Sequence, residues 1–471
     1  MSSEGRRVNR ERSDSVSEGQ NAGASRGLTR WQAVPLAIGS VAGSGILFLP
    51  SAVYARAGNN SLLVWALSTL LCLPMLLMFD DMVRSNPDGR GIEAFIRAGL
   101  GDMFARCVPL MFIALVVVGL PSGTFVAGRY VARTFAMDRA AVIAIGLAVL
   151  LAAALVNLAG VRTSTRVQTA ASWGLVLMAA ALLAAAAPSA DHGLSSVAPG
   201  TQHLDVVLPG VVLAFWAFAG FENLTFLARE FRAPARDFLP VSAIALAVYG
   251  LFTILLTVAI AVCVPRQNVD QVVGLLQLAA AVGHGKFVLW AVTLIACTAM
   301  LLNAIAWVWG VSQMARDAAV NGLLPAALLD PEEAGAPRRA LGLLCVLFSA
   351  TSVLLSLRPS LVVDTTAAAS AIFMLLYILS IVSYLRVRGL TLRSGLNLLL
   401  LVVIAASLVE SVWEALYALV AFVAALSVQL LQRRRAPQNS DRTPHGGVDT
   451  DGLLVDGVHG GAPGGGDDAD L

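Results

Sequence analysis

Long apolar stretches follow one another along the chain of 471 residues, separated by short breaks with charged, Pro or Gly residues. The hydrocarbon core of a bilayer is about 30 Å thick, so a helix needs about 20 apolar residues to cross it. Counting the stretches between breaks predicts about twelve membrane-spanning helices. They cover residues 31–56, 61–83, 91–132, 139–158, 165–187, 206–228, 239–264, 285–315, 339–357, 360–385, 394–409 and 411–432. The stretch 91–132 is too long for one span, so we expect it to begin as a short interfacial helix near Ile92–Leu100.

Composition agrees with an all-α integral membrane protein. Hydrophobic residues make up 57% of the chain and charged residues only 13%, which a soluble domain could not accommodate. Five Cys residues stand singly in apolar stretches, without the Cys or Cys/His spacing of a metal site. We therefore predict the lipid bilayer and a small molecule as partners, with no metal, no cofactor and no nucleic acid; the sequence does not predict the oligomeric state.

The basic residues predict the orientation in the membrane. If the N-terminus is cytoplasmic, all but seven of the 32 basic residues fall in cytoplasmic segments. The seven on the other side are Arg56, Arg129, Arg133, Arg139, Arg266, Lys286 and Arg358. By the positive-inside rule, both termini are predicted to lie in the cytoplasm, and the even number of spans agrees with this.

The domain organisation follows from the same breaks. Polar residues 1–30, without an apolar segment that would serve as a signal peptide, predict a disordered cytoplasmic tail, and the Gly-, Pro- and Asp-rich residues 433–471 predict another. The transmembrane domain is predicted at residues 31–432.

Two spans contain breaks in unusual places. The first carries Gly43, Ser44, Gly45 and Ile46, and each Gly costs a helix about 1 kcal/mol relative to Ala. The sixth carries Trp216-Ala217-Phe218-Ala219-Gly220 and then Glu222, a carboxylate in an apolar run. Each feature alone also fits close helix packing or a structural carboxylate.

Unwound backbone is tolerated at membrane depth where it lines a cavity, because its free N–H and C=O groups need partners. An amino acid supplies such partners, with a carboxylate for a half-helix N-terminus and an ammonium for free carbonyl groups. The two breaks lie on spans one and six, so five helices (residues 31–187) are predicted to repeat in inverted orientation as five more (206–385), with two extra helices at 394–432.

The motifs resemble those of the amino acid/polyamine/organocation (APC) transporter superfamily, and the overall look is similar to bacterial exporters of methionine and branched-chain amino acids. The resemblance rests on Gly43-Ser44-Gly45-Ile46 with Pro50, on Phe218-Ala219-Gly220-Phe221-Glu222 with Glu230, Pro234 and Pro240, and on the loops Asn86–Gly91, Val161–Gln168, Met314–Asp317 and Gly322–Pro325.

This resemblance implies a LeuT-type fold and a defined site. It implies that backbone at Gly43 to Ile46 receives the substrate carboxylate and that backbone at Trp216 to Gly220 receives the amine. Trp216 matches an aromatic gate of related antiporters, and Glu222 matches their proton-responsive group. The chain departs from many proton-coupled members because the fifth span has no Lys at Ser172–Val176. The eighth span also lacks the paired hydroxyl groups of a sodium site.

The sequence therefore predicts a secondary transporter of neutral, apolar amino acids, because no spare acidic residue accompanies the expected site. Export coupled to protons or to exchange is the expected mode. Uptake or antiport of cationic amino acids or polyamines is the alternative, and a non-transporting membrane sensor is an alternative of another class. No motif of an enzyme or an ATP-driven pump is present. Four further polar residues have expected roles. Asp80 and Asp81 are expected to form a solvated interfacial pair, with a gate salt bridge as the alternative. Asp364 is expected to be a helix N-cap, with an external gate as the alternative, and Asn303 an interhelical hydrogen-bonding residue.

Overall fold

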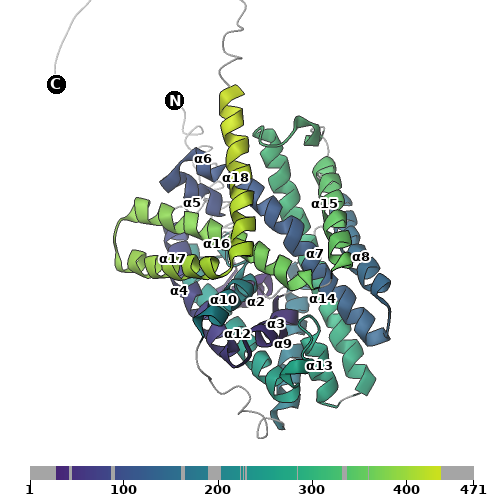
Figure 1. Cartoon of the computed structure of the whole chain (residues 1–471). Helices are drawn as coiled ribbons and strands as arrows, with labels where there is room; N and C mark the ends of the chain where they lie inside the picture. Colours follow the sequence, from purple (N-terminus) through teal and green to yellow (C-terminus); the bar gives the residue numbers. More distant parts are fainter. Residues whose placement is uncertain are drawn as a thin grey trace, which may run out of the picture.

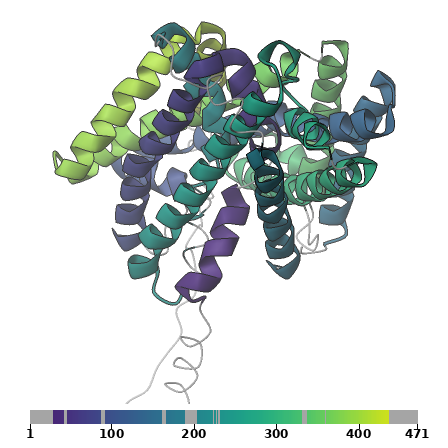
Figure 2. The ribbon, with the colours of Figure 1, turned by 90° about the horizontal axis from the view of Figure 1, so that it is seen from below.

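The computed structural model describes residues 28–41, 45–85, 91–160, 165–188, 203–222, 224–225, 228, 231–283, 285–330, 337–358 and 360–435. Within them the chain is helical, and the β-structure is confined to one isolated bridge between Leu28 and Phe231. Figures 1 and 2 show the helices gathered into one bundle, with α18 extending beyond its neighbours. The predicted tails lie mostly outside the described residues.

The helices of the first half are α2 (Arg30–Val41), α3 (Gly45–Ala57), α4 (Ser61–Ser85), α5 (Gly91–Leu100), α6 (Asp102–Ala105), α7 (Val108–Phe135), α8 (Arg139–Leu158) and α9 (Thr165–Ala186). Those of the second half are α10 (Leu204–Phe215), η4 (Trp216–Phe218), α12 (Pro234–Cys263), α13 (Gly274–Ala281), α14 (Gly285–Val320), α15 (Arg338–Leu357), α16 (Leu361–Arg388), α17 (Leu392–Glu410) and α18 (Val412–Arg435).

Ten stretches in the described part of the chain are long and apolar enough to cross a membrane. The sequence predicts about twelve. The two numbers differ because residues 45–85 count as one continuous helical stretch, although two spans are predicted there, and because α10 with η4 is too short to count. The predicted division of the third apolar stretch is confirmed, since α5 ends at Leu100 and α7 begins at Val108.

The helices pack in two groups. In the first, α4 and α12 lie against each other, with α2, α3 and α10 packed on them. In the second, α7, α8, α14 and α15 pack on one another. Helix α16 lies between the groups and contacts both α7 and α10, and α9 contacts both α2 and α14. The buried apolar residues of both groups form one continuous core, because α16 packs against each of them.

Local chemistry sets several helix ends. Asp138 begins α8 by accepting a hydrogen bond from the backbone N–H of Ala141 at 3.0 Å. Thr391 begins α17 in the same way, through Ser394 at 3.2 Å. Such side-chain caps satisfy N–H groups that have no partner inside the helix.

Candidate functional site

Helix α10 stops at Phe215, which confirms the predicted break in this apolar stretch. One 3₁₀ turn, η4, follows, and then Ala219 takes an extended conformation with φ −65° and ψ 127°. Gly220 has φ +119°, a conformation that L side chains rarely adopt. The chain can therefore turn here because residue 220 is a glycine.

Glu222 fixes this turn from inside the protein. Its side chain is buried, and Oε2 accepts a hydrogen bond from the backbone N–H of Gly220 at 3.0 Å. The same oxygen accepts a 2.6 Å hydrogen bond from the Tyr377 hydroxyl of α16. Oε1 has no partner among the described residues. The carboxylate thus joins the unwound segment to α16 and keeps one oxygen unpaired.

Helix α3 begins at Gly45, beside the unwound segment that follows α10. A Cβ atom added at Gly45 would lie 3.1 Å from the Ala217 Cα and 2.9 Å from the Tyr249 hydroxyl oxygen. That hydroxyl group is buried and has no partner among the described residues. Since the first N–H groups of a helix have no partner within it, α3 presents its positive end beside η4.

The two predicted residues Gly43 and Ser44 lie outside the described residues, between the end of α2 at Val41 and the start of α3. Gly45 and Ile46 are buried in the first turn of α3, and Gly45 approaches Ala217. Phe218 is buried, with its ring 6.2 Å from that of Trp65. The structure therefore brings the two predicted segments together at Gly45 and Ala217, while the Phe218 side chain belongs to the apolar core.

An aromatic cluster on α16 borders the unwound segment. The ring of Phe373 lies 6.2 Å from the rings of Trp216, Trp307 and Tyr377 alike. It also makes an edge contact with Phe112 of α7 at 5.7 Å. These centroid distances are typical of favourable aromatic pairs. The Phe373 ring therefore connects α7 and α14 with Trp216 and with Tyr377, which donates a hydrogen bond to Glu222.

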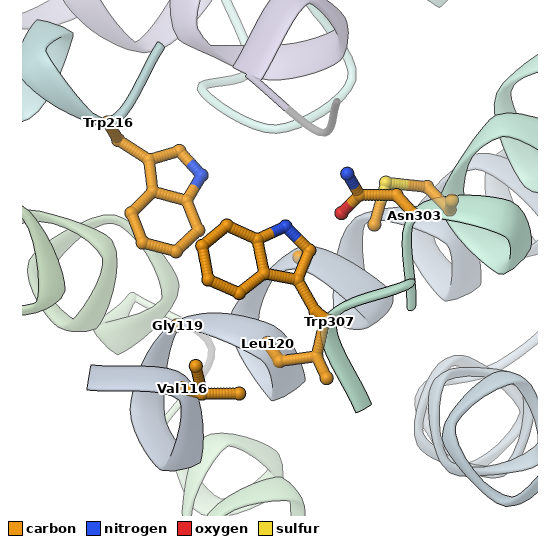
Figure 3. A pocket seen from close by; sticks show the side chains of 8 residues that line it. Val116, Gly119, Leu120, Trp216, Asn303 and Trp307 are labelled. Atoms are coloured by element: carbon orange, nitrogen blue, oxygen red, sulfur yellow. The ribbon is translucent and has the colours of Figure 1, made fainter. Parts of the chain in front are cut away.

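A pocket lies on the other side of Trp216. Its lining comes from α7, η4 and α14: Val116, Gly119, Leu120, Gly123, Trp216, Met300, Asn303 and Trp307. Figure 3 shows the indole rings of Trp216 and Trp307 beside each other. The free space is ≈ 10 Å³, the room that about one water molecule needs. In this conformation the pocket is closed around its two indoles.

Gly119 lets the Trp216 ring come this close. A Cβ atom at residue 119 would overlap the Cη2 atom of the indole and lie 2.9 Å from its Cζ3. The ring rests on the α7 backbone, and any larger residue at 119 would push it away.

Two ion pairs join segments that lie far apart in the sequence. Arg56, near the end of α3, binds Asp364 of α16 at 2.7 Å. Arg129 of α7 binds Asp270, in the loop after α12, at 2.6 Å. The favoured expectation that Asp364 is the helix N-cap is wrong, because Ser360 is the N-cap of α16 and the Asp364 carboxylate in its first turn pairs with an arginine of another helix.

Asp80 and Asp81 also differ from expectation. The Asp80 side chain has no exposed surface, and it binds Arg84 at 2.9 Å and Arg393 of α17 at 3.2 Å. Asp81 binds Arg393 at 2.6 Å and accepts a 2.5 Å hydrogen bond from Tyr384. The predicted solvated pair is in fact a partly buried network that joins α4, α16 and α17, because α17 packs over the end of α4.

Sequence reasoning missed Trp307 and Met300 and assigned Asn303 to helix packing. Met300, Asn303 and Trp307 stand at spacings of three and four on one face of α14, and that spacing is the signal that could have grouped them. Gly119 and Gly123 show the same spacing on α7.

The described residues contain no group of three or more His, Cys, Asp or Glu side chains arranged to hold a metal ion. Ser312, the hydroxyl residue nearest to the position of a sodium site in the eighth predicted span, donates to the Trp309 carbonyl of its own helix at 2.8 Å.

Comparison with known proteins gives the site its context. The sequence model of the family described as "Amino acid permease" matches residues 28–434. The L-methionine/branched-chain amino acid exporter YjeH of Escherichia coli is 27% identical over 220 residues, 47% of this chain and 52% of the relative. The uncharacterized amino acid permease YecA of Bacillus subtilis is 27% identical over 45% of this chain and 50% of its own length.

An uncharacterized transporter of Mycobacterium tuberculosis is 28% identical over 302 residues, 62% of this chain and 66% of its own. The chain spans about half the length of the first two relatives. Since the family match covers most of the sequence, the APC resemblance is confirmed: this multi-pass membrane protein belongs to the amino acid permease family.

Proposed function

We propose that the protein is a secondary active transporter that moves neutral, apolar amino acids across a bacterial cytoplasmic membrane by alternating access. One observation carries the proposal: the N-terminus of α3 and the unwound turn after α10 meet where Gly45 approaches Ala217. The first N–H groups of α3 on one side and the carbonyl groups of the unwound turn on the other would suit the two charges of an amino acid.

The substrate backbone would bind between these segments. Its carboxylate would accept from the N–H groups of Gly43 to Ile46, and its ammonium would donate to the carbonyl groups of Trp216 to Gly220. The side chain would enter the adjacent pocket once Trp216 moves. No charged residue lines that pocket, which favours neutral side chains over cationic amino acids and polyamines. The name of the Escherichia coli relative supports the same substrate class.

The packing groups supply the moving parts of an alternating-access cycle. We assign α2–α9 and α10–α16 to two inverted repeats, residues 31–187 and 206–385, followed by the two extra helices at 394–432. The first group then combines the first two spans of each repeat, and the second group combines their third and fourth, as inverted repeats require. Both termini would face the cytoplasm, since most basic residues then lie there.

Coupling would pass through Glu222. Glu222 is buried beside the turn, its Oε1 has no partner among the described residues, and its Oε2 accepts hydrogen bonds from Gly220 and Tyr377 rather than from a basic side chain. Proton binding to this group during the cycle, or amino acid exchange without protons, would drive transport, and export is the direction that the relative's name supports.

Counterflow in proteoliposomes tests the proposal. Vesicles are loaded with one unlabelled amino acid at a time, and entry of labelled leucine or methionine is followed without an ion gradient. Faster entry with neutral aliphatic amino acids inside is the expected result. Folded, inserted protein that exchanges no amino acid would refute transport and favour a non-transporting sensor, whereas exchange confined to arginine or polyamines would refute the substrate class.

A further inference from the structure

Asn303 is the polar side chain of an otherwise apolar pocket. It stands on α14, three residues after Met300 and four before Trp307, and all three line the pocket. Figure 3 shows its carboxamide and the Trp216 indole on opposite sides of Trp307. Because all three residues line the pocket, a substrate side chain that fills it would meet the Asn303 amide group as well as the two indole rings.

The carboxamide of Asn303 makes no hydrogen bond to any residue that the structure describes. The contrast with two other asparagines within helices is clear. Asn157 donates to the Ile305 carbonyl at 3.1 Å, and Asn397 donates to the Pro74 carbonyl at 3.0 Å. These two join helices, which is the role expected of Asn303 from the sequence. Asn303 lacks that role, so packing does not explain why an amide stands here.

The Asn303 residue is partly exposed, so water can serve its amide while the site is empty. A substrate that covers the amide without replacing its hydrogen bonds would cost about 1–3 kcal/mol. The pocket has room for about one water molecule, which can serve the amide while the pocket is empty. A substrate side chain displaces that water. An all-carbon side chain then leaves the amide unpaired, while a side chain with an acceptor atom restores a partner.

The rest of the lining limits how polar that acceptor can be. Val116 and Leu120 offer no hydrogen bond, the two indoles can only donate, and the Met300 sulfur is a weak acceptor, so the NH₂ group of a strongly hydrated side chain such as glutamine would lack a good partner. A thioether sulfur suits both demands, since it is apolar enough to enter and is still a weak acceptor. Sulfur also makes favourable contacts with aromatic rings.

We propose that Asn303 selects the substrate by its side-chain end, so that methionine is preferred over an all-carbon side chain of the same shape. This inference rests on the proposed function and names the substrate of the same site. Norleucine is the matched probe, because it replaces the sulfur of methionine by a methylene group. One weak hydrogen bond gives a preference of about two- to tenfold.

The test measures competition by methionine and by norleucine against labelled leucine in counterflow. Wild-type protein should be inhibited about two- to tenfold better by methionine. Leucine is close to asparagine in size. Asn303→Leu should therefore bring the two inhibition constants together by lowering that of norleucine. Asn157→Leu makes the same change outside the pocket and should keep the wild-type ratio.

Equal inhibition of the wild type by both probes would overturn the inference even if Asn303→Leu failed to fold. A methionine preference that survives in folded Asn303→Leu would also overturn it, as would its loss in Asn157→Leu. Each of these outcomes leaves amino acid exchange intact. Absence of exchange with every amino acid is the separate result that refutes the proposed function.

Discussion

Replacing Gly45 by alanine tests whether the approach of α3 to the unwound segment forms the substrate site. The new methyl group would lie 2.9 Å from the Tyr249 hydroxyl oxygen, 3.1 Å from the Ala217 Cα and 3.3 Å from the Leu49 Cδ1. All three distances are shorter than an ordinary van der Waals contact, so the segments must separate. Overpacking of this kind costs about 1–3 kcal/mol.

If this overpacking destabilises the substrate-bound state, the affinity for substrate should drop about five- to 150-fold, since each 1.4 kcal/mol is about a factor of ten. The assay is binding of labelled substrate to purified protein. Gly310→Ala is the control, because a Cβ atom there would meet no heavy atom within 4 Å.

A second substitution separates the two contacts. Tyr249→Phe removes the hydroxyl oxygen and leaves the Ala217 contact, so the Gly45→Ala/Tyr249→Phe double variant should recover part of the lost affinity. Wild-type affinity in Gly45→Ala, in protein as well folded as the Gly310→Ala control, would refute the assignment of the site to this junction.

Three further predictions concern other parts of the chain. Glu222→Gln keeps the size of the side chain but cannot bind or release a proton, so the pH dependence of transport should flatten; an unchanged pH profile would leave Glu222 a structural role. Deletion of residues 438–471 should leave transport rates within about twofold of wild type in vesicle assays, and loss of activity in normally inserted protein would contradict this. Arg393→Ala should lower the free energy of unfolding in micelles by about 1.5–3 kcal/mol, because the buried Asp80 loses a charged partner. Arg97→Ala, which breaks exposed pairs, should change it by less than about 1 kcal/mol, and equal effects would show that burial of the network is unimportant.

The sequence predicted the broad architecture well because each membrane span must satisfy its backbone internally and face lipid, which leaves a strong apolar signal. It also located the break after Phe215, since Gly220 and Glu222 are unusual in an apolar run. The division of helices into two packing groups could not be read in this way, because it depends on contacts between segments far apart in the chain.

The site was predicted in part for a similar reason. Local features marked Gly45 and Glu222, but Tyr377 reaches Glu222 from a helix 155 positions away in sequence. No local pattern reports such a contact. Asp80 was wrongly expected to be solvated because its neighbour Arg84 suggested a cytoplasmic surface, and nothing nearby in sequence indicates that α17 covers it.

Helices α17 and α18 both pack on α16, but α17 also contacts α4 and α10 of the first group, whereas α18 contacts α7 of the second. Arg393 holds α17 to α4, while Gln429 of α18 donates to the Arg106 carbonyl at 3.2 Å, and Arg106 lies just before α7. Only Ser411 separates the two helices. If the groups rotate against each other during a cycle, this single residue has to act as the hinge between them. A pair of spin labels, one on each helix, would then report the rotation as a change in distance without touching the substrate site.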